Sequence, residues 1–260
     1  MREIIKHSVI AFAVLIAIWQ IGIVLGGVNT NLFPAPLQVL DALNELWSRG
    51  LLGGSSDLTL PGHIAVSLGR FLVGYLLAAA AGIGLGLLLG YFPRAFAYVN
   101  PVIQLIRPIA PVAWMPFIVL WFGIGNIPAI VIIFIAGFFP VLLATAGAVG
   151  TIDPVYWKVA DNFGMTGAQK IAKIVFPGIF PQIAASLKLA IGTSWIFLVS
   201  GEMVGAQSGL GFLIMDAKNS LRPDSLLAVM IVIGIIGLIL DKLIGLLEKK
   251  VRTRWGVGNV

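Results

Sequence analysis

Residues Trp157–Pro177 read WKVADNFGMTGAQKIAKIVFP and form a polar segment between long apolar runs. The segment carries three lysines, at positions 158, 170 and 173. Glycine favours turns and proline ends helices, so the pattern predicts a short helix, a turn at Gly164 and a second helix that stops at Pro177. Asp153 and Pro154 can cap the first of these helices.

The composition around this segment is that of a membrane protein. The chain has 260 residues, of which 59% are hydrophobic and 11% charged, and its mean hydropathy is +1.02. A helix needs about 20 apolar residues to cross a bilayer, so we expect an all-α, polytopic membrane protein. The chain has no cysteine, which excludes disulfides and thiol chemistry. Its two histidines, His7 and His63, are too far apart in sequence to suggest a metal site.

Six apolar segments are predicted to span the membrane, at about residues 8–25, 63–91, 98–122, 127–149, 177–204 and 226–247. The first is longer than the core of a typical signal peptide and is expected to be retained. Four prolines in the third predict a broken or kinked helix. In the second, Gly82, Gly84, Gly86 and Gly90 are expected to let helices approach closely.

These segments divide the chain into three expected regions. Residues 1–62 hold the first helix and an external connector, residues 63–247 form a core with a loop at 151–176, and residues 248–260 form a tail. Within the connector, residues 37–47 place four apolar side chains at helical spacing: Leu37, Leu40, Leu43 and Trp47. This pattern favours either a helix on the outer membrane surface or an ordinary solvated connector.

The basic residues set the expected orientation. With both ends inside, the inner segments hold Arg2, Lys6, Arg94, Lys158, Lys170, Lys173, Lys242, Lys249, Lys250, Arg252 and Arg254, whereas the outer segments hold Arg49, Lys218 and Arg222. Three more, Arg70, Arg107 and Lys188, fall within spans. The positive-inside rule therefore places the polar loop and both termini in the cytoplasm. The net charge of +6 is explained by this topology and does not indicate a nucleic-acid partner.

Several motifs resemble one family. The spacing G-x9-I-x-x-P, from Gly164 to Ile174 and Pro177, resembles the cytoplasmic EAA loop of ABC-importer permeases, in which Ala160 matches the last alanine. The strings RPIAPVAWMPFIVLWFG (residues 107–123) and GTSWIFLVSGEMVGAQSGLGFLIMDA (residues 192–217) resemble the nitrate/sulfonate/taurine permeases. The likeness extends over nearly the whole chain, from Pro34 to Trp255.

The resemblance implies a type I ABC-importer permease fold in a bacterial inner membrane. It implies a homodimer, two ATPase subunits below and a substrate-binding protein outside. The residues implied to couple to the ATPase are Tyr156, Trp157, Lys158, Ala160, Asp161, Gly164, Ile174 and Pro177. The chain has no G-x-x-x-x-G-K-[ST] segment, so we expect no enzyme activity and no cofactor of its own, with ATP and magnesium bound by the partner. The implied solute is a small anion or polar organic molecule: nitrate, bicarbonate, a sulfonate, taurine or a vitamin precursor.

The candidate residues for the translocation pathway are Arg107, Trp114, Thr193, Ser194, Trp195, Ser200 and Glu202. Arg107 could instead snorkel to the interface, and Glu202 could instead be solvated at the outer surface. Two other functions remain open, an ATP-independent secondary transporter or channel and a non-transporting scaffold. The first would require charged groups near the middle of the membrane and inverted repeats, and neither is evident in the sequence.

Overall fold

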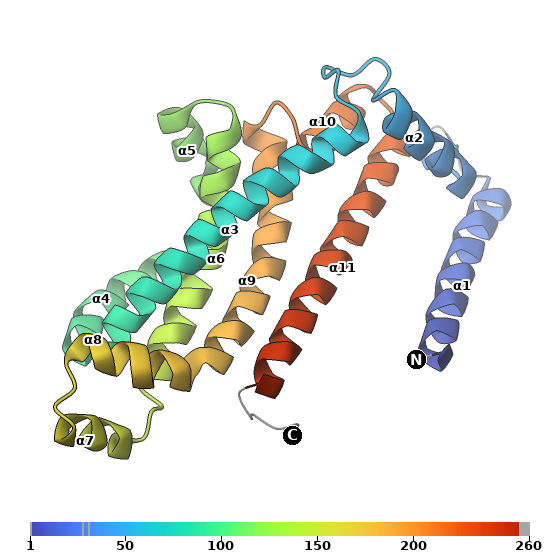
Figure 1. Ribbon diagram of the computed structural model, residues 1–260. Coiled ribbons are helices and arrows are strands. Elements are labelled where there is room, and N and C mark those ends of the chain that lie inside the picture. Colours follow the sequence, from blue (N-terminus) through green and yellow to red (C-terminus); the bar gives the residue numbers. More distant parts are fainter. Residues whose placement is uncertain (1, 28, 31, 255–260) are drawn as a thin grey trace. The chain divides into compact units, whose positions relative to one another are not determined.

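The regular elements are helices throughout the part of the chain that the computed structural model describes, residues 2–27, 29–30 and 32–254. In order (Figure 1), they are α1 (Arg2–Gly26), α2 (Pro36–Ser48), α3 (Leu60–Tyr91), α4 (Pro93–Ile106), a 3-10 turn (Pro111–Trp114), α5 (Met115–Phe122), α6 (Asn126–Val149), α7 (Pro154–Asn162), α8 (Gly167–Lys170), a π turn (Ile171–Val175), α9 (Phe176–Gly205), α10 (Leu210–Asn219) and α11 (Pro223–Arg254). The predicted all-α class is confirmed. Residues 255–260 of the expected tail lie outside the described residues.

Among the described residues, four helices are long and apolar enough to cross a membrane: α3, α6, the continuous helix 167–205 that contains α9, and α11. Helix α4 and the pair formed by the 3-10 turn and α5 are bent by 85° and count as a fifth span if they cross together. The predicted break in the third span is thereby confirmed. The apolar part of α1, residues 10–26, is shorter, so a sixth span at the N-terminus stays a prediction.

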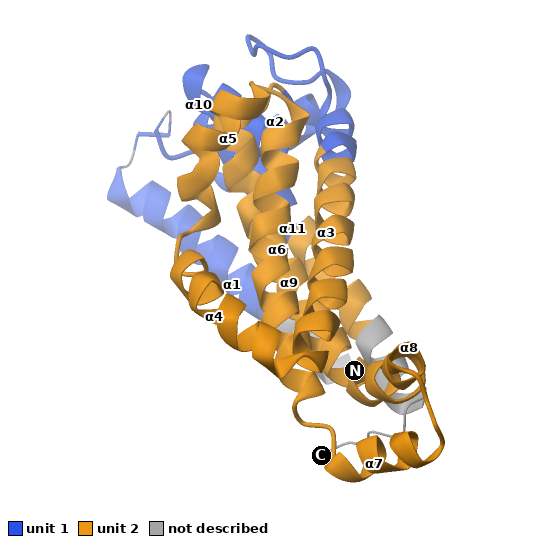
Figure 2. Cartoon of the chain, turned by 90° about the vertical axis from the view of Figure 1, so that its left-hand side faces the viewer, with its two compact units in different colours: residues 1–66, 208–235 blue, residues 67–207, 236–260 orange. Residues whose placement is uncertain are grey.

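The chain forms two compact units, each described here by itself (Figure 2). Unit 1 comprises residues 1–66 and 208–235, and unit 2 comprises residues 67–207 and 236–260. The expected region boundaries at residues 62 and 247 follow the sequence, not contacts, and stay predictions. The polar loop and all the candidate pathway residues belong to unit 2.

Within unit 2, glycines of α3 lie directly against the backbone of α6. A Cβ added at Gly74 would stand 2.9 Å from the Ile130 carbonyl oxygen, and one at Gly82 would stand 3.2 Å from that of Phe138. A Cβ at Gly86 would stand 2.8 Å from the Leu142 carbonyl oxygen, and one at Gly90 would stand 2.9 Å from that of Ala146. The glycines recur every four or eight residues and so share one face of the helix. The predicted close approach is confirmed for Gly82, Gly86 and Gly90. It is wrong for Gly84, which faces open space because it stands half a turn away.

Helix α6 also packs along α9, and α6 is therefore the centre of unit 2. A Cβ at Gly137 would stand 2.8 Å from the Ser194 Oγ, and one at Gly201 would stand 3.4 Å from the Ala129 Cα. The side chains of Ile132 and Ile133 are fully buried. Small residues allow this packing in lipid, where the hydrophobic effect does not draw helices together.

The second helix of the polar loop does not stop at Pro177, which corrects the prediction. Residues 167–205 form one helix of 39 residues, and Pro177 lies in the first turn of α9. The π turn just before it provides the reason. The Phe176 N–H bonds to the Ile171 carbonyl, five residues back, and this wider turn accommodates a proline ring that would disrupt an ordinary α-helix.

In unit 1, α2 forms as predicted, but the buried face is not the one that carries Leu37, Leu40 and Trp47. Its buried side chains are Val39, Ala42 and Leu46, whereas Leu37, Leu40 and Trp47 are exposed. Apolar residues at helical spacing predict an amphipathic helix, but they do not say which side meets the protein. Whether the exposed apolar side lies on a membrane surface stays a prediction.

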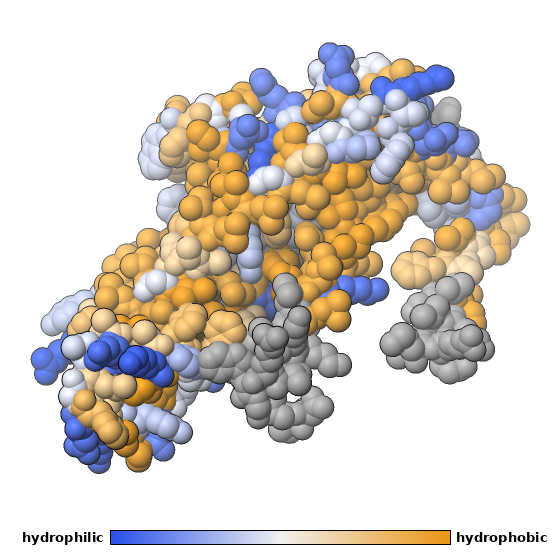
Figure 3. Space-filling model, in the orientation of Figure 1, coloured by the Kyte–Doolittle hydropathy of each residue, from blue (hydrophilic) through white to orange (hydrophobic). Residues whose placement is uncertain are grey.

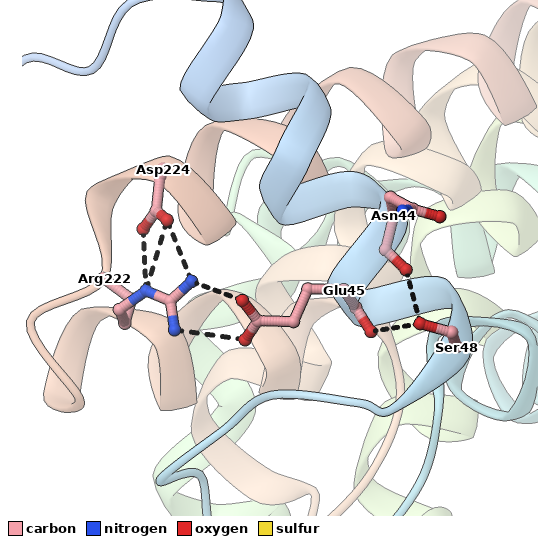
Figure 4. A network of polar contacts seen from close by, with 5 residues as sticks. All are labelled: Asn44, Glu45, Ser48, Arg222 and Asp224. Atoms are coloured by element: carbon pink, nitrogen blue, oxygen red, sulfur yellow. Dashed lines mark hydrogen bonds and ion pairs between the residues drawn. The ribbon is translucent and has the colours of Figure 1, made fainter.

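A charged network connects segments of unit 1 that lie far apart in the sequence (Figure 4). Arg222 donates two hydrogen bonds of 3.1 Å to the Glu45 carboxylate of α2, and it also contacts Asp224 at the start of α11. The carboxylates of Asp224 and Glu45 raise the pKa of Arg222. The network joins α2 to the segment between α10 and α11.

We expect the substitution Gly86→Ala to destabilise the protein by about 1–3 kcal/mol, because its Cβ would overlap backbone and side-chain atoms of α6. Gly84→Ala is the matched control, since nothing lies within 4 Å of its Cβ position. Heating each variant in detergent and measuring the surviving monodisperse fraction checks this. Equal survival of the two variants would contradict the close packing of α3 on α6.

Candidate functional site

The polar loop begins with the short helix α7. Asp153 caps this helix, because its Oδ1 accepts a hydrogen bond of 2.8 Å from the Val155 N–H. Pro154 follows in the first turn, where a missing N–H leaves no partner unsatisfied. The predicted cap is confirmed.

Helix α7 ends in a Schellman motif at Gly164. The Gly164 N–H donates to the Asp161 carbonyl at 2.9 Å, and the Met165 N–H donates to the Ala160 carbonyl at 3.0 Å. Gly164 has φ +63°, a conformation that costs glycine little. The predicted turn is confirmed, and backbone conformation explains the glycine, since nothing surrounds its Cβ position.

The second arm of the loop starts with a capping box. The Thr166 N–H donates to the Gln169 Oε1 at 2.9 Å, and the Gln169 N–H donates to the Thr166 Oγ1 at 3.4 Å. From there the chain continues through the π turn into α9. The second arm of the loop and the span are therefore parts of one continuous helix.

Three contacts hold the two arms of the loop together and to the end of α3. Asp161 forms an ion pair with Lys170 across the turn. The rings of Trp157 and Tyr91 lie 5.7 Å apart, and Gly167 approaches the Tyr91 hydroxyl closely. Because the Asp161 carboxylate is exposed, its ion pair contributes little by itself, and ring packing on Tyr91 fixes the loop.

The outer side of α7 presents apolar side chains to solvent. Val155, Tyr156, Val159 and Phe163 are exposed by 58%, 59%, 44% and 80%. Hydrophilic and hydrophobic patches lie side by side in the region of α7 and α8 (Figure 3, lower left). Exposed apolar groups rimmed by polar ones are typical of a protein-binding surface. Val155, Val159 and Phe163 are not among the predicted coupling residues, although their spacing of four residues is visible in the sequence.

The predicted coupling residues occupy different environments in this loop. Tyr156, Lys158, Asp161 and Gly164 are exposed, Trp157, Ile174 and Pro177 are half-buried, and Ala160 is fully buried. The first group could meet a partner directly, whereas the others shape the loop. Their contact with an ATPase stays a prediction.

A cleft of about 600 Å³ opens beside α7. Asp153 and Tyr156 line it on the α7 side, and Lys173, Ile174 and Pro177 line it on the side of the π turn and α9. The cleft is lined by the opposite charges of Asp153 and Lys173 and by apolar side chains such as Ile174. It can therefore accept a protruding side chain from a partner. Three of the predicted coupling residues, Tyr156, Ile174 and Pro177, belong to this cleft.

Behind the cleft, a hydrophobic cluster connects the loop to the spans. Its buried members come from the end of α6, the π turn and the start of α9: Ala148, Val149, Val175, Ile179 and Ile183. Trp157 of α7 packs against them. Helix α7 is therefore packed directly against the ends of two spans.

The predicted pathway residues of α9 do not form one surface. Ser194 is buried and donates to the Ile133 carbonyl at 3.2 Å. Trp195 packs edge-on against Phe71, with ring centroids 5.5 Å apart. Thr193 is exposed and bonds to carbonyls of its own helix, and Ser200 is half-buried. Whether any of them meets the solute stays a prediction.

Glu202 lies at the centre of a buried polar network. Its Oε1 is 2.7 Å from the Arg70 Nη1, and the Ser67 hydroxyl donates to its carboxylate at 2.8 Å. The same guanidinium donates to the Asn126 Oδ1 at 2.6 Å. Glu202 is thus not a solvated group in this chain. The sequence alone did not predict the Arg70–Glu202 ion pair, although charged residues of opposite sign within apolar spans are expected to pair.

The remaining two candidates, Arg107 and Trp114, stand near the break between α4 and α5. Arg107 is the C-terminal cap of α4 and is exposed, and Trp114 ends the 3-10 turn and is half-buried. Their neighbourhood is the irregular backbone that the prolines impose. These two residues thus lie on a different segment from the other candidates, which all belong to α9.

A bundle of spanning helices with a structured polar loop is the architecture of a membrane permease, and comparisons with known proteins agree. The model of the family "Binding-protein-dependent transport system inner membrane component" matches residues 82–253. The chain belongs to this family, as its motifs predicted, and it is the permease component of an ABC importer.

Curated relatives extend over nearly the whole chain. It is 33% identical to the putative aliphatic sulfonates transport permease protein SsuC of Bacillus subtilis, over 92% of this chain and 83% of that protein. It is 33% identical to the taurine transport system permease protein TauC of Escherichia coli, over 95% of this chain and 89% of that protein. It is 36% identical to the nitrate import permease protein NrtB of Leptolyngbya laminosa, over 94% and 86%. The predicted nitrate/sulfonate/taurine family is thereby confirmed.

The fold has a solved counterpart. A chain of the MetNI methionine ABC transporter, in an inward-facing conformation, aligns with a TM-score of 0.58 and 19% identity. The alignment covers 71% of this chain and 94% of that one. The likeness confirms the expected importer permease fold.

We expect Glu202→Gln to destabilise the protein by about 3–5 kcal/mol, because it leaves the buried Arg70 charge uncompensated. The double variant Arg70→Met with Glu202→Leu should be more stable than the single one. Thermal survival in detergent checks both, with the exposed Lys158→Gln as the control. A single variant as stable as the control would show that the ion pair does not form.

Proposed function

We propose that this chain docks through its loop, residues 151–176, on a P-loop ATPase that drives import. The supporting observation is the exposed apolar side of α7. The distribution of basic residues favours a cytoplasmic position for this loop, where an ATPase can reach it. A soluble subunit that covers Val155, Val159 and Phe163 would bury side chains that are otherwise costly to expose.

The proposed coupling uses the continuity of the loop with the spans. A displacement of α7 acts on the hydrophobic cluster behind it, and the helix 167–205 carries the displacement along α9. Since α9 packs against α6 along its length, the two spans move together. The resulting tilt exchanges inward-facing and outward-facing states, which is alternating access. The π turn between loop and span is the place where this helix can bend.

The proposed assembly contains two copies of this chain, ATPase subunits in the cytoplasm and a substrate-binding protein outside. In this proposal the permease lies in a bacterial inner membrane with both termini in the cytoplasm. ATP and magnesium bind to the ATPase, and this chain holds no cofactor and catalyses no reaction. Its share of the work is to provide the path and the docking surface.

The proposed solute is a small molecule with an oxyanion group. The names of the relatives mention aliphatic sulfonates, taurine and nitrate, which share this feature. The ATP-independent transporter or channel is not favoured, because a docking loop of this kind would have no purpose there. A scaffold without transport would not explain the broken span.

We predict that a P-loop ATPase copurifies with the tagged chain from native membranes in mild detergent. The substitution Phe163→Ser should weaken its retention about tenfold or more, because a buried phenylalanine contributes about 1.5–3 kcal/mol. Leu221→Ser is the matched control, since Leu221 is 86% exposed but lies in the segment expected outside. Retention of the ATPase by Phe163→Ser, or its absence throughout, would refute the docking surface.

We predict that Gly164→Val uncouples ATP hydrolysis from transport, because a β-branched residue resists the positive φ of this turn. Gly164→Asn should keep much of the coupling, since asparagine tolerates this conformation. The two rates, measured on the same reconstituted complex, give the ratio of solute moved to ATP hydrolysed. If both variants kept the ratio of the unsubstituted chain, the shape of the loop would be irrelevant to coupling.

A further inference from the structure

Helix α4 carries a polar stripe that the function above does not use. Asn100, Gln104 and Arg107 stand at positions i, i+4 and i+7 and so share one side of the helix. The Gln104 Nε2 donates to the Asn100 Oδ1 at 3.3 Å. Gln104 and Arg107 are exposed and Asn100 is half-buried. Within the described part of the chain, Arg107 forms no hydrogen bond or ion pair through its side chain.

The remaining surface of α4 has a different character. Ile103 is almost fully buried. On the side away from it, Tyr98, Val102 and Leu105 are exposed by 84%, 55% and 75%. This outer side suits the hydrocarbon of a membrane. The polar stripe does not, because a charged arginine facing lipid is costly and unsatisfied amide groups add to the cost.

The stripe ends at the break in the span. Figures 1 and 2 show α4 at the end of unit 2 where α8 lies and α5 at the opposite end. The two are bent by 85°, and Arg107 caps α4 where the chain turns. Irregular backbone within a membrane is tolerated only where it contacts protein or lines a water-filled cavity. The polar stripe and the break thus both require contact with protein or with water inside the membrane.

We propose that Asn100, Gln104 and Arg107 line the water-filled path of the solute, with Arg107 as its positive charge at the break. This inference rests on the proposed import function, which it extends with a specific surface. A guanidinium and two amide groups offer several N–H donors to the oxygens of a sulfonate or nitrate. One charge with neutral donors attracts an anion without holding it, as a conducting path requires.

The absence of cysteine from the chain makes this directly testable. Asn100→Cys and Gln104→Cys place thiols on the stripe, and Val102→Cys and Leu105→Cys place matched thiols on the apolar side. A membrane-impermeant methanethiosulfonate should modify the stripe thiols about tenfold faster or more, because the reactive thiolate forms in water and not in lipid. Similar rates at all four positions would overturn the proposal.

The direction of access separates the path from an ordinary surface helix. In membranes that contain the whole complex, the stripe thiols should react from the cytoplasmic side without nucleotide. They should react from the outer side when a non-hydrolysable ATP analogue is bound. Reaction from the cytoplasmic side alone in both states would place the stripe on the membrane surface and overturn this inference, while import itself would stand. Insensitivity to nucleotide, with access from both sides, would overturn the ATP-driven function and leave the path.

The charge of Arg107 has its own test. At Gln104→Cys, a reagent that carries a sulfonate should react several-fold faster than one that carries a trimethylammonium group. Adding Arg107→Gln should remove this preference, and Arg107→Lys should keep it. Unchanged preference in the Arg107→Gln variant would show that Arg107 does not act on the path.

Discussion

The close approach of α3 to α6 is the constraint on which the rest of unit 2 depends. Lipid does not drive apolar helices together, so the contact area that small residues allow has to hold them. Four glycines of α3 bring its backbone against carbonyls of α6, and glycines of α6 and α9 allow the contact between those two helices. Because these helices are fixed at short range, the loop at their ends is held in one place.

The proposed coupling through the loop depends on this rigidity. Trp157 packs on Tyr91 at the end of α3 and on the cluster formed by α6 and α9. The turn at Gly164 returns the chain into a helix that is continuous with α9. A partner that binds α7 would therefore transmit its displacement to the spans, whereas a flexible loop would not. The buried Arg70–Glu202 pair fixes α9 to α3 toward the opposite end of the same unit.

The sequence predicted much of this architecture, because membrane helices and turns leave local signals. The apolar runs, the cap at Asp153, the turn at Gly164 and the broken third span depend on residues close in the chain. The sequence could not predict how each helix is rotated about its axis. That rotation puts Gly84 on an open face, buries Val39 in place of Leu40, and turns Ser194 inward while Thr193 stays exposed. Pro177 was misjudged because the π turn that accommodates it has no simple residue pattern.

The central claim is that α7 is the part of this permease that an ATPase holds. The most direct measurement is photocrosslinking in intact membranes, with a benzophenone amino acid at Phe163 in one sample and at Leu221 in another. The account predicts an adduct between position 163 and a protein with a P-loop motif, and no such adduct at position 221. A chain that remains uncrosslinked at position 163, or an ATPase adduct at position 221, would contradict it.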